Sequence, residues 1–463
     1  SVIRTQAEQL AAQVGGKLLE DESLLDEVVN LVEQPTALRG TFPQRFLALP
    51  REVLITVMRH KQRYFAVEDL NGGLLPYFIA VRNGDDQFLE EVVQGNEHVL
   101  NARFADADFF FKEDLKRPLA ERAERLKTMT FQEKLGSLYD KTVRLTRYVQ
   151  PLAERLALSE DEVRVAAEAA ALARADQGTQ MVIEMTALEG VMGREYALRE
   201  GKPPAVAQAI FESYLPRAAA DQLPESKAGA LLALADRLDS LVGLFAVGLA
   251  PTASADPFAL RRAALGAVQI IIKHAFNVSL SDLLPIFAAE QPVPSETLEQ
   301  VRHFIVGRLE NLMREEHGLP HDVVAAVLRE QGDKPYRALQ GGRELAAWVA
   351  KSEWSAILDS FARCARITRD KPRYALRAEA LTPAEAQALH AAAQRAHAAL
   401  DADSNVGAFL SAFAELVPPI TTFFDKVLVM DEDAAVRENR LALLQYITDL
   451  ARGRADLSQL SGF

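Results

Sequence analysis

Residues 163–175 of the chain read VRVAAEAAALARA, and residues 228–244 read AGALLALADRLDSLVGL. In both stretches apolar residues recur every three or four positions, which is typical of a helix that buries one face. The same spacing continues over most of the chain from Leu119 onward. The sequence therefore predicts a mainly α-helical protein.

Prolines divide this helical part into segments. A proline inside a helix removes a hydrogen bond and clashes with the preceding turn, so we expect these prolines to lie between helices. They are Pro203, Pro204, Pro224, Pro251, Pro257, Pro285, Pro292 and Pro294. We predict one helical domain over residues 119–250 and further helices over residues 251–345 and 346–463.

Strand signals are confined to residues 1–118. Residues 62–68 and 74–81 are rich in β-branched and aromatic side chains, and they flank Asn71-Gly72, a pair that favours a tight hairpin. A helix is expected to open at Gly95 and to run toward three consecutive phenylalanines. We therefore predict a small α/β module before the helical domains, and a multidomain protein.

Composition bounds the class of protein. The chain has 463 residues, 49% of them hydrophobic, and a net charge of −13. No stretch approaches the roughly 20 apolar residues that cross a bilayer, so a cytoplasmic protein without a membrane partner is expected. The acidic balance argues against a protein that coats DNA or RNA nonspecifically, although a local basic face remains compatible with it. The chain opens at Ser1 without Met, so we expect it to be part of a longer protein.

The single cysteine limits redox and metal chemistry. Cys364 cannot form an internal disulfide, and one thiol cannot build a thiol-rich metal site. Its surroundings have a helical pattern, so Cys364 is interpreted as a small apolar side chain inside a helix.

Several strings of residues, in one order, resemble the β subunit of the bacterial tetrameric glycyl-tRNA synthetase. They are LPREVLI (49–55), HKQRYF (60–65), FQEKLGS (131–137), DPFALRR (256–262), FFDKV (423–427) and NRLALL (439–444). The resemblance implies that the chain is the C-terminal two-thirds of that subunit and that it binds tRNA(Gly). It also implies an α subunit partner in an α2β2 enzyme, which would use ATP and Mg²⁺ to activate glycine. No cofactor is expected in this chain.

Two short stretches resemble an HD phosphohydrolase domain. Residues 171–176 read ALARAD and residues 235–239 read ADRLD, with Ala175 where an active enzyme of that family has histidine. Asp176 and Asp236 would be the remnants of the site, and two acids without imidazole bind divalent metal weakly. The resemblance implies a degenerate HD-like domain over residues 119–250, without catalytic or metal-binding residues.

A literal His-Asp pair occurs elsewhere, at His321-Asp322. Asp322 is interpreted as the N-cap of a helix that follows it. His317 and His321 have the spacing of two ligands on one helix, but Gly318 and Pro320 lie between them. We therefore expect that the two histidines do not share a helix.

The C-terminal part resembles the DALR anticodon-binding domain, which is a helical bundle. The match is Phe258-Ala259-Leu260-Arg261 after Asp256-Pro257. The bundle starts either at residue 251 or near residue 345, and the sequence leaves both open. Residues 251–345 are thus a helical linker or the first part of the anticodon-binding region, and residues 346–463 are the bundle.

RNA recognition needs cations for phosphates and planar groups for unpaired bases. The densest basic run of the chain supplies both, and we predict tRNA contacts for Arg363, Arg366, Arg369, Lys371, Arg373, Tyr374 and Arg377. A solvated helix end and loop would explain the run equally well.

Two smaller sets are further candidates for tRNA contact. Arg437 and Arg440 share one helix face, although the acids at 431–433 are close enough to pair with them. Arg59, Lys61 and Arg63 lie at a predicted junction between a helix and a strand.

Three functions are compatible with these features. The favoured one is a tRNA-binding subunit of a glycine–tRNA ligase. The alternatives are a metal-dependent phosphohydrolase of the HD type, which the alanine at position 175 disfavours, and a helical scaffold that binds other proteins.

Overall fold

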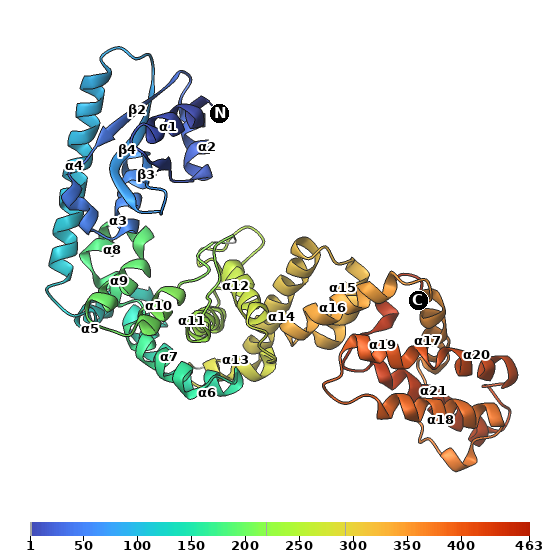
Figure 1. The fold of residues 1–463 in the computed structure, drawn as a ribbon. Helices are drawn as coiled ribbons and strands as arrows, with labels where there is room; N and C mark the ends of the chain where they lie inside the picture. Colours follow the sequence, from blue (N-terminus) through green and yellow to red (C-terminus); the bar gives the residue numbers. More distant parts are fainter. Residues whose placement is uncertain (1, 219, 292) are drawn as a thin grey trace. The chain divides into compact units, whose positions relative to one another are not determined.

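The computed structural model describes residues 2–218, 220–291 and 293–463, and helices dominate them (Figure 1). Ser1 and Pro292, which enter the predictions above, lie outside the described residues. The chain forms two compact units, the first made of residues up to 150 with 159–217 and 224–233, and the second of 151–158, 218–223 and 234–463. The predicted fold class, mainly α with a small N-terminal sheet, is confirmed. The domain boundaries at 118, 250 and 345 stay predictions.

The only sheet of more than two strands among the described residues lies in the first unit. Its strands are β1 (Lys17–Leu18), β2 (Pro35–Thr41), β3 (Phe65–Glu68) and β4 (Leu74–Asn83). All neighbours are antiparallel, in the order β1-β3-β4-β2. The predicted hairpin is β3–β4, and Gly72 adopts the positive φ of +86° that its turn requires.

Strand β3 begins later than predicted. Helix α3 (Arg51–Thr56) continues into a π-helical segment, η2 (Val57–Gln62), and Arg63 in the left-handed region ends it. Residues 62–64 therefore terminate a helix, because Tyr64 donates its backbone N–H back to Met58.

Helices cover the sheet. Apolar side chains of α1 (Val2–Ala12) and α2 (Glu22–Leu31) pack against Phe65 and Ile79. The long helix α4 (Leu89–Asp114) packs against β2, and Figure 1 shows it on the other side of the sheet from α1 and α2. Contacts of Phe104 with Phe42, at 4.9 Å between ring centroids, help to hold α4 there.

The prediction that a helix opens at Gly95 is wrong, because α4 starts at Leu89. Glu90 and Glu91 lie in its first turn, where negative charge stabilises the helix dipole. A single glycine inside a helix costs only about 1 kcal/mol, so Gly95 does not end it.

The rest of the first unit is helical, apart from one small hairpin. Its elements are α5 (Leu119–Arg122), α6 (Leu138–Arg155, shared with the second unit), α7 (Glu160–Leu172), α8 (Gln180–Glu184), α9 (Val191–Arg199) and α10 (Pro204–Glu212). The hairpin joins β5 (Thr130–Gln132) to β6 (Gly136–Ser137), so strands are not confined to residues 1–118. With strands this short, no alternating pattern marks the hairpin in the sequence.

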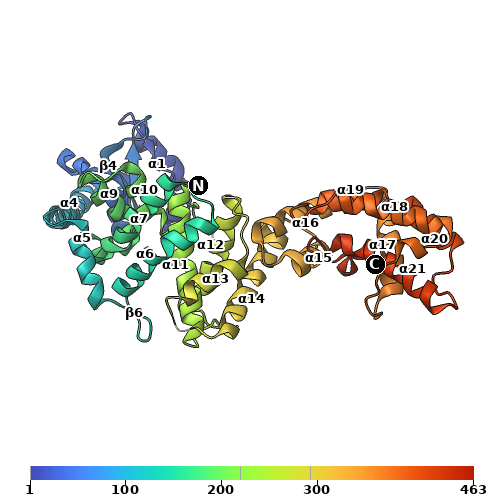
Figure 2. The ribbon, with the colours of Figure 1, turned by 90° about the horizontal axis from the view of Figure 1, so that it is seen from below.

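Helix α11 (Lys227–Ala246) continues into the second unit, where all other long elements are helices. These are α12 (Leu260–Lys273), α13 (Leu280–Ala288), α14 (Ser295–Asn311), α15 (His321–Gln331), α16 (Pro335–Val349), α17 (Trp354–Thr368), α18 (Ala384–Ala398), α19 (Val406–Ala414), α20 (Val417–Lys426) and α21 (Ala434–Thr448). A second π-helical segment, η6 (Leu312–Glu316), follows α14. Figure 2 shows α17–α21 gathered in one group, whose core contains Phe361 and Phe413 at 5.5 Å.

The prediction that all of the prolines named above lie between helices is wrong for Pro285, which lies inside α13. Leu283, Leu284 and Phe287 of the same helix are buried, so tertiary packing holds the helix despite the lost hydrogen bond. Other prolines begin helices as expected, with Pro204 in the first turn of α10 and Pro294 at the N-cap of α14.

Within the described residues no single helix is long and apolar enough to cross a membrane. One bent pair, α19 with α20, reaches that length and composition only when the two helices are taken together across a bend of 47°.

Candidate nucleic-acid interface

The helix predicted over residues 163–175 ends early, so Asp176 does not continue it. Helix α7 ends at Leu172, Arg174 adopts the left-handed region with φ of +64°, and Asp176 lies in the 3-10 turn η4 (Ala175–Gly178). This break in the helix turns the carboxyl group of Asp176 into the interior.

Protein donors occupy both oxygens of this buried carboxyl group. Oδ1 accepts a hydrogen bond of 2.7 Å from the hydroxyl of Tyr214, and Oδ2 accepts one of 2.6 Å from the backbone N–H of Gly190. The N–H of Gly193 adds a longer one of 3.3 Å. Burial raises the pKa of Asp176 and also that of Tyr214. Asp176 therefore anchors the beginning of α9.

The surroundings of Asp176 do not fit a metal centre. Ala175 is fully buried, so there is no space at that position for the imidazole of an HD enzyme. Across residues 2–218, 220–291 and 293–463, no three side chains of the His, Cys, Asp and Glu types come together in a way that could hold a metal ion. On α11, Asp236 is half-buried, and the fully buried Asp239 accepts a hydrogen bond of 2.8 Å from Gln291.

The interpretation of Asp322 as an N-cap is wrong. Helix α15 begins at His321, one residue before Asp322, and Pro320 is its N-cap. Asp322 instead joins the chain end to this helix, because Oδ2 accepts the backbone N–H of Ser461 at 2.9 Å and this bond lowers the pKa of Asp322. His317 follows η6 and His321 opens α15, so the two histidines lie on separate elements, as expected.

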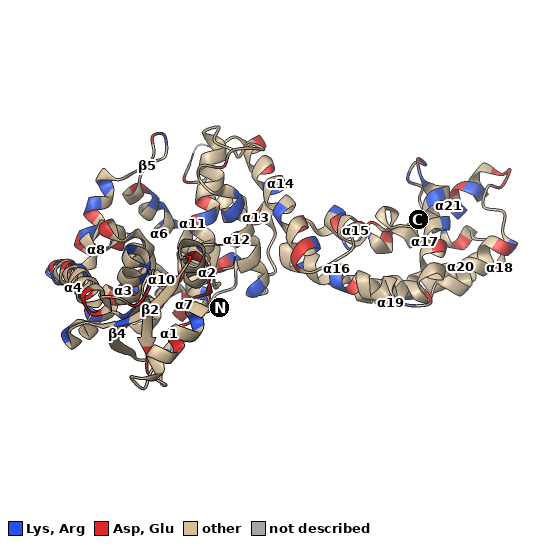
Figure 3. Cartoon of the chain, turned by 90° about the horizontal axis from the view of Figure 1, so that it is seen from above, with Lys and Arg blue, Asp and Glu red and all other residues tan. Residues whose placement is uncertain are grey.

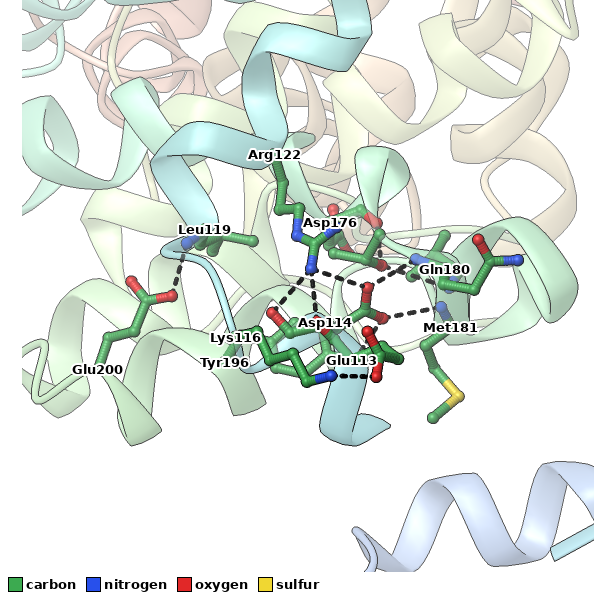
Figure 4. A network of polar contacts seen from close by, with 12 residues as sticks. Glu113, Asp114, Lys116, Leu119, Arg122, Asp176, Gln180, Met181, Tyr196 and Glu200 are labelled. Atoms are coloured by element: carbon green, nitrogen blue, oxygen red, sulfur yellow. Dashed lines mark hydrogen bonds and ion pairs between the residues drawn. The ribbon is translucent and has the colours of Figure 1, made fainter. Parts of the chain in front are cut away.

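A second buried acid, which sequence reasoning missed, fixes the end of α4 (Figure 4). Asp114 accepts the backbone N–H groups of Gln180 and Met181 at 2.8 and 2.9 Å, and the hydroxyl of Tyr196 at 2.9 Å. Arg122 lies 3.6 Å away and also binds the carbonyl oxygen of Asp114. Asp114 thus caps α8 from a helix that ends 66 residues earlier, and no local pattern signals such a contact.

The basic run begins on the last turns of α17. Arg363 and Arg366 are exposed, and each guanidinium lies over an aromatic ring, that of Phe424 at 4.5 Å and that of Phe463 at 5.4 Å. A stacked guanidinium has a restricted orientation, so these two cations are presented to solvent in a defined way.

The loop after α17 is held against α21 through its backbone. Gln445 accepts the N–H of Tyr374 and donates to the carbonyl of Pro372, at 3.1 and 2.8 Å. Asn439 makes two bonds of the same kind with the backbone of Arg377, at 2.8 and 2.9 Å. Two buried amides of α21 therefore fix the path of an exposed loop.

The basic side chains of this loop are suited to two roles, contact with an external anion and attachment of the loop to the bundle. Arg369, Lys371 and Arg377 are exposed, and Figure 3 shows basic positions gathered on this loop beside α21. Arg373 forms a two-pronged ion pair with Asp449, which raises the pKa of Arg373. The first three can reach an anion directly, whereas Arg373 also fastens the loop.

The second candidate set is largely engaged in structure. Arg440 is only 8% exposed and donates to the carbonyl of Leu428 and the carboxylate of Asp431, both at 2.7 Å. Arg437 donates to the backbone carbonyl of Asp431 at 2.8 Å. The sequence left open whether these arginines pair with nearby acids. In the structure Arg440 does so, with Asp431.

The third candidate set lies at the expected junction between a helix and a strand. Arg59 pairs with Asp21 at 3.1 Å and Arg63 with Glu27 at 2.5 Å, and both acids flank or belong to α2. Lys61 is exposed and borders a small pocket of about 90 Å³. Of the three, Lys61 is the residue best placed to meet an external anion.

The chain is similar to known proteins over its whole length. A family model described as "Glycyl-tRNA synthetase beta subunit" matches residues 1–329. The chain is 41% identical over 470 residues to the "Glycine--tRNA ligase beta subunit" of Desulforamulus reducens, covering 99% of this chain and 67% of the relative. For the protein of the same name from Moorella thermoacetica the identity is 43% over 474 residues, with 99% and 68% covered.

A plant protein is similar as well. The chain is 40% identical to the "Glycine--tRNA ligase, chloroplastic/mitochondrial 2" of Arabidopsis thaliana over 468 residues, which is 100% of this chain and 44% of the relative. The chain thus spans about two thirds of the length of the bacterial relatives and less than half of the plant protein. On the extent of these matches, the chain belongs to the glycyl-tRNA synthetase β subunit family, whose members are subunits of an aminoacyl-tRNA synthetase.

Proposed function

We propose that this chain is the tRNA-binding part of the β subunit of an α2β2 glycine–tRNA ligase. It positions tRNA(Gly) and contacts the anticodon region through its C-terminal helices. The α subunit uses ATP and Mg²⁺ to activate glycine and transfers it to the tRNA. The β subunit thus binds the tRNA, and the α subunit carries out the chemical steps.

The observation that carries this proposal is the exposed basic loop fixed on α21. Arg377 projects from a backbone that Asn439 holds in place. Arg369 and Lys371 are exposed just before Pro372 and Tyr374, which Gln445 holds. A preorganised loop loses little conformational entropy when it binds, so its cations contribute more of their attraction to phosphate. The stacked Arg366 adds a planar group of the kind that unpaired bases stack on.

The buried acids support a role without chemistry in this chain. The carboxylate oxygens of Asp176 and Asp114 accept hydrogen bonds from backbone N–H groups and tyrosine hydroxyls. Neither carboxyl group can act as a general base while these donors occupy it. What this chain then contributes to catalysis is proximity and the selection of the correct tRNA.

The proposal is tested by assaying the two steps separately. The chain, with its α subunit, is prepared as wild type and as an Arg369→Gln/Lys371→Gln double variant. Glycine-dependent exchange between ATP and pyrophosphate is expected to stay unchanged, whereas charging of tRNA(Gly) should need roughly tenfold more tRNA. An equal loss of both activities would contradict the division of labour.

A further inference from the structure

A second cationic surface lies in a groove of the second unit. The groove has a volume of about 270 Å³ and lies between the beginning of α12 and the end of α14 with η6. Its polar lining consists of Arg261, Arg262, Arg308, Asn311, Glu315 and Glu316. Three guanidinium groups thus border one groove, although the net charge of the chain is −13.

The start of α12 is built so that two of these arginines face the groove. Asp256 accepts the backbone N–H groups of Leu260 and Arg261 at 2.8 and 2.9 Å and thereby caps the helix. Arg261 also donates to the carbonyl of Thr252 at 2.5 Å, and its guanidinium lies 3.8 Å from Asp256. Arg261 is therefore oriented by its neighbours and only partly neutralised.

Arg308 supplies the opposite wall of the groove. Its guanidinium lies 5.5 Å from the centre of the Phe304 ring, which restricts its orientation. Its Nε is buried and has no acceptor among the described residues. A buried N–H without an acceptor is costly, and Arg308 thus borders the groove with one of its donors unused.

The segment η6 completes this wall. It is π-helical, and π-helical turns occur frequently at functional sites. Two of its residues, Glu315 and Glu316, are exposed at the border of the groove, whereas Arg261 and Arg308 are half-buried. The carboxylates lower the net positive charge, so they would weaken the binding of an anion without preventing it.

We propose that this groove binds a phosphodiester group of the RNA backbone, as a second tRNA contact outside residues 363–377. Planar guanidinium groups bind two phosphate oxygens at once, which suits three arginines and one amide around a single groove. The inference rests on the proposed function, because that function supplies the RNA.

The test compares variants of the full chain that each remove one charge, three of them at arginines. Arg262→Gln and Arg308→Gln change the groove, while Arg314→Gln is the matched control. Arg314 is exposed and belongs to η6, but it does not line the groove, and it pairs with Glu310 at 3.7 Å. Binding of a tRNA(Gly) transcript is measured by fluorescence anisotropy over a series of salt concentrations.

Each groove variant is expected to bind roughly tenfold more weakly than Arg314→Gln and to lower the slope of log affinity against log salt by about one. Glu315→Gln is expected to tighten binding about twofold, because it removes a carboxylate that repels phosphate. A folding defect cannot produce tighter binding, so this variant separates ligand contact from stability.

The failures of the two proposals are distinguishable. Groove variants with the affinity and salt slope of Arg314→Gln, while the wild type binds tRNA(Gly), would overturn the inference alone. A wild-type chain that does not bind tRNA(Gly) would overturn the proposed function, and the phosphodiester site with it.

Discussion

The hydroxyl of Tyr214 donates a 2.7 Å hydrogen bond to Oδ1 of Asp176. Both groups are buried, and the guanidinium of Arg174 lies 5.1 Å from the centre of the tyrosine ring. The pair connects the turn after α7 with the end of α10, while Oδ2 of the same acid holds the start of α9. This buried acid therefore stabilises the fold.

Replacing Asp176 tests this structural role. Asp176→Ala would leave the hydroxyl of Tyr214 and the N–H of Gly190 buried without an acceptor, which is expected to cost about 3 kcal/mol or more of stability. Hydrogen exchange of the α9 amides measures the loss. Asp161→Ala, at an exposed position of α7, serves as the control and should change stability by less than about 0.5 kcal/mol. Equal protection of α9 in both variants would argue against the anchor.

Installing the histidine of an HD enzyme should not create a metal site. Ala175→His places an imidazole where the native side chain is fully buried, so overpacking is expected to cost about 1–3 kcal/mol. Thermal unfolding with and without Mn²⁺ is the measurement, and the metal should not raise the midpoint. A rise in the midpoint together with metal-dependent hydrolysis of a phosphate ester would revive the phosphohydrolase hypothesis.

Arg440 and Arg369 should separate structure from binding. Arg440→Gln removes charged hydrogen bonds to Leu428 and Asp431 inside the α17–α21 group and is expected to cost about 2–4 kcal/mol. Arg369→Gln changes an exposed side chain and should cost less than about 0.5 kcal/mol while weakening tRNA binding. Urea unfolding, together with hydrogen exchange of the α21 amides, measures the loss of stability in each variant. The reverse ranking of the two variants would refute this assignment of roles.

Glu68 gives the first unit a predictable dependence on pH. A hydrogen bond of 2.7 Å from Arg51, and a weaker contact with Lys17, hold the pKa of Glu68 below its ordinary value of 4.5. A lowered pKa in the folded state stabilises the protein above pH 4.5, and this contribution is lost as the pH falls through the lowered value. Because Arg51 and Lys17 are partly exposed, the contribution should be only about 1 kcal/mol.

The comparison of wild type with Glu68→Gln measures this contribution. The wild type should be the more stable protein at pH 7, and the difference should shrink as the pH falls below about 4. A difference that stays constant from pH 7 to pH 3 would show that the charge of Glu68 does not stabilise the fold.

Local patterns in the sequence were sufficient for part of this fold. Asn71-Gly72 predicted the β3–β4 hairpin, and the three- and four-residue spacing predicted the helical body. The strings of residues that resemble the glycyl-tRNA synthetase β subunit predicted the family that the comparisons show. These features depend on neighbours in the chain, which a sequence displays directly.

Two features that the sequence did not reveal depend on distant contacts. Asp176 leaves its helix because Gly190 and Tyr214 supply its donors, and Asp114 caps a helix 66 residues away. The exposure of individual side chains could not be predicted either. Arg440 and Arg369 both lie near other basic residues in the sequence, but Arg440 is buried and Arg369 is exposed. The tRNA contacts themselves stay predictions.

The most direct test of the central claim is the binding of this chain to tRNA(Gly) transcripts with the native and with a swapped anticodon, across a salt series. We predict binding that weakens on swapping by about 1–3 kcal/mol per altered base contact and that declines as salt rises. Equal affinity for both transcripts, or no binding at all, would contradict anticodon recognition by the C-terminal helices.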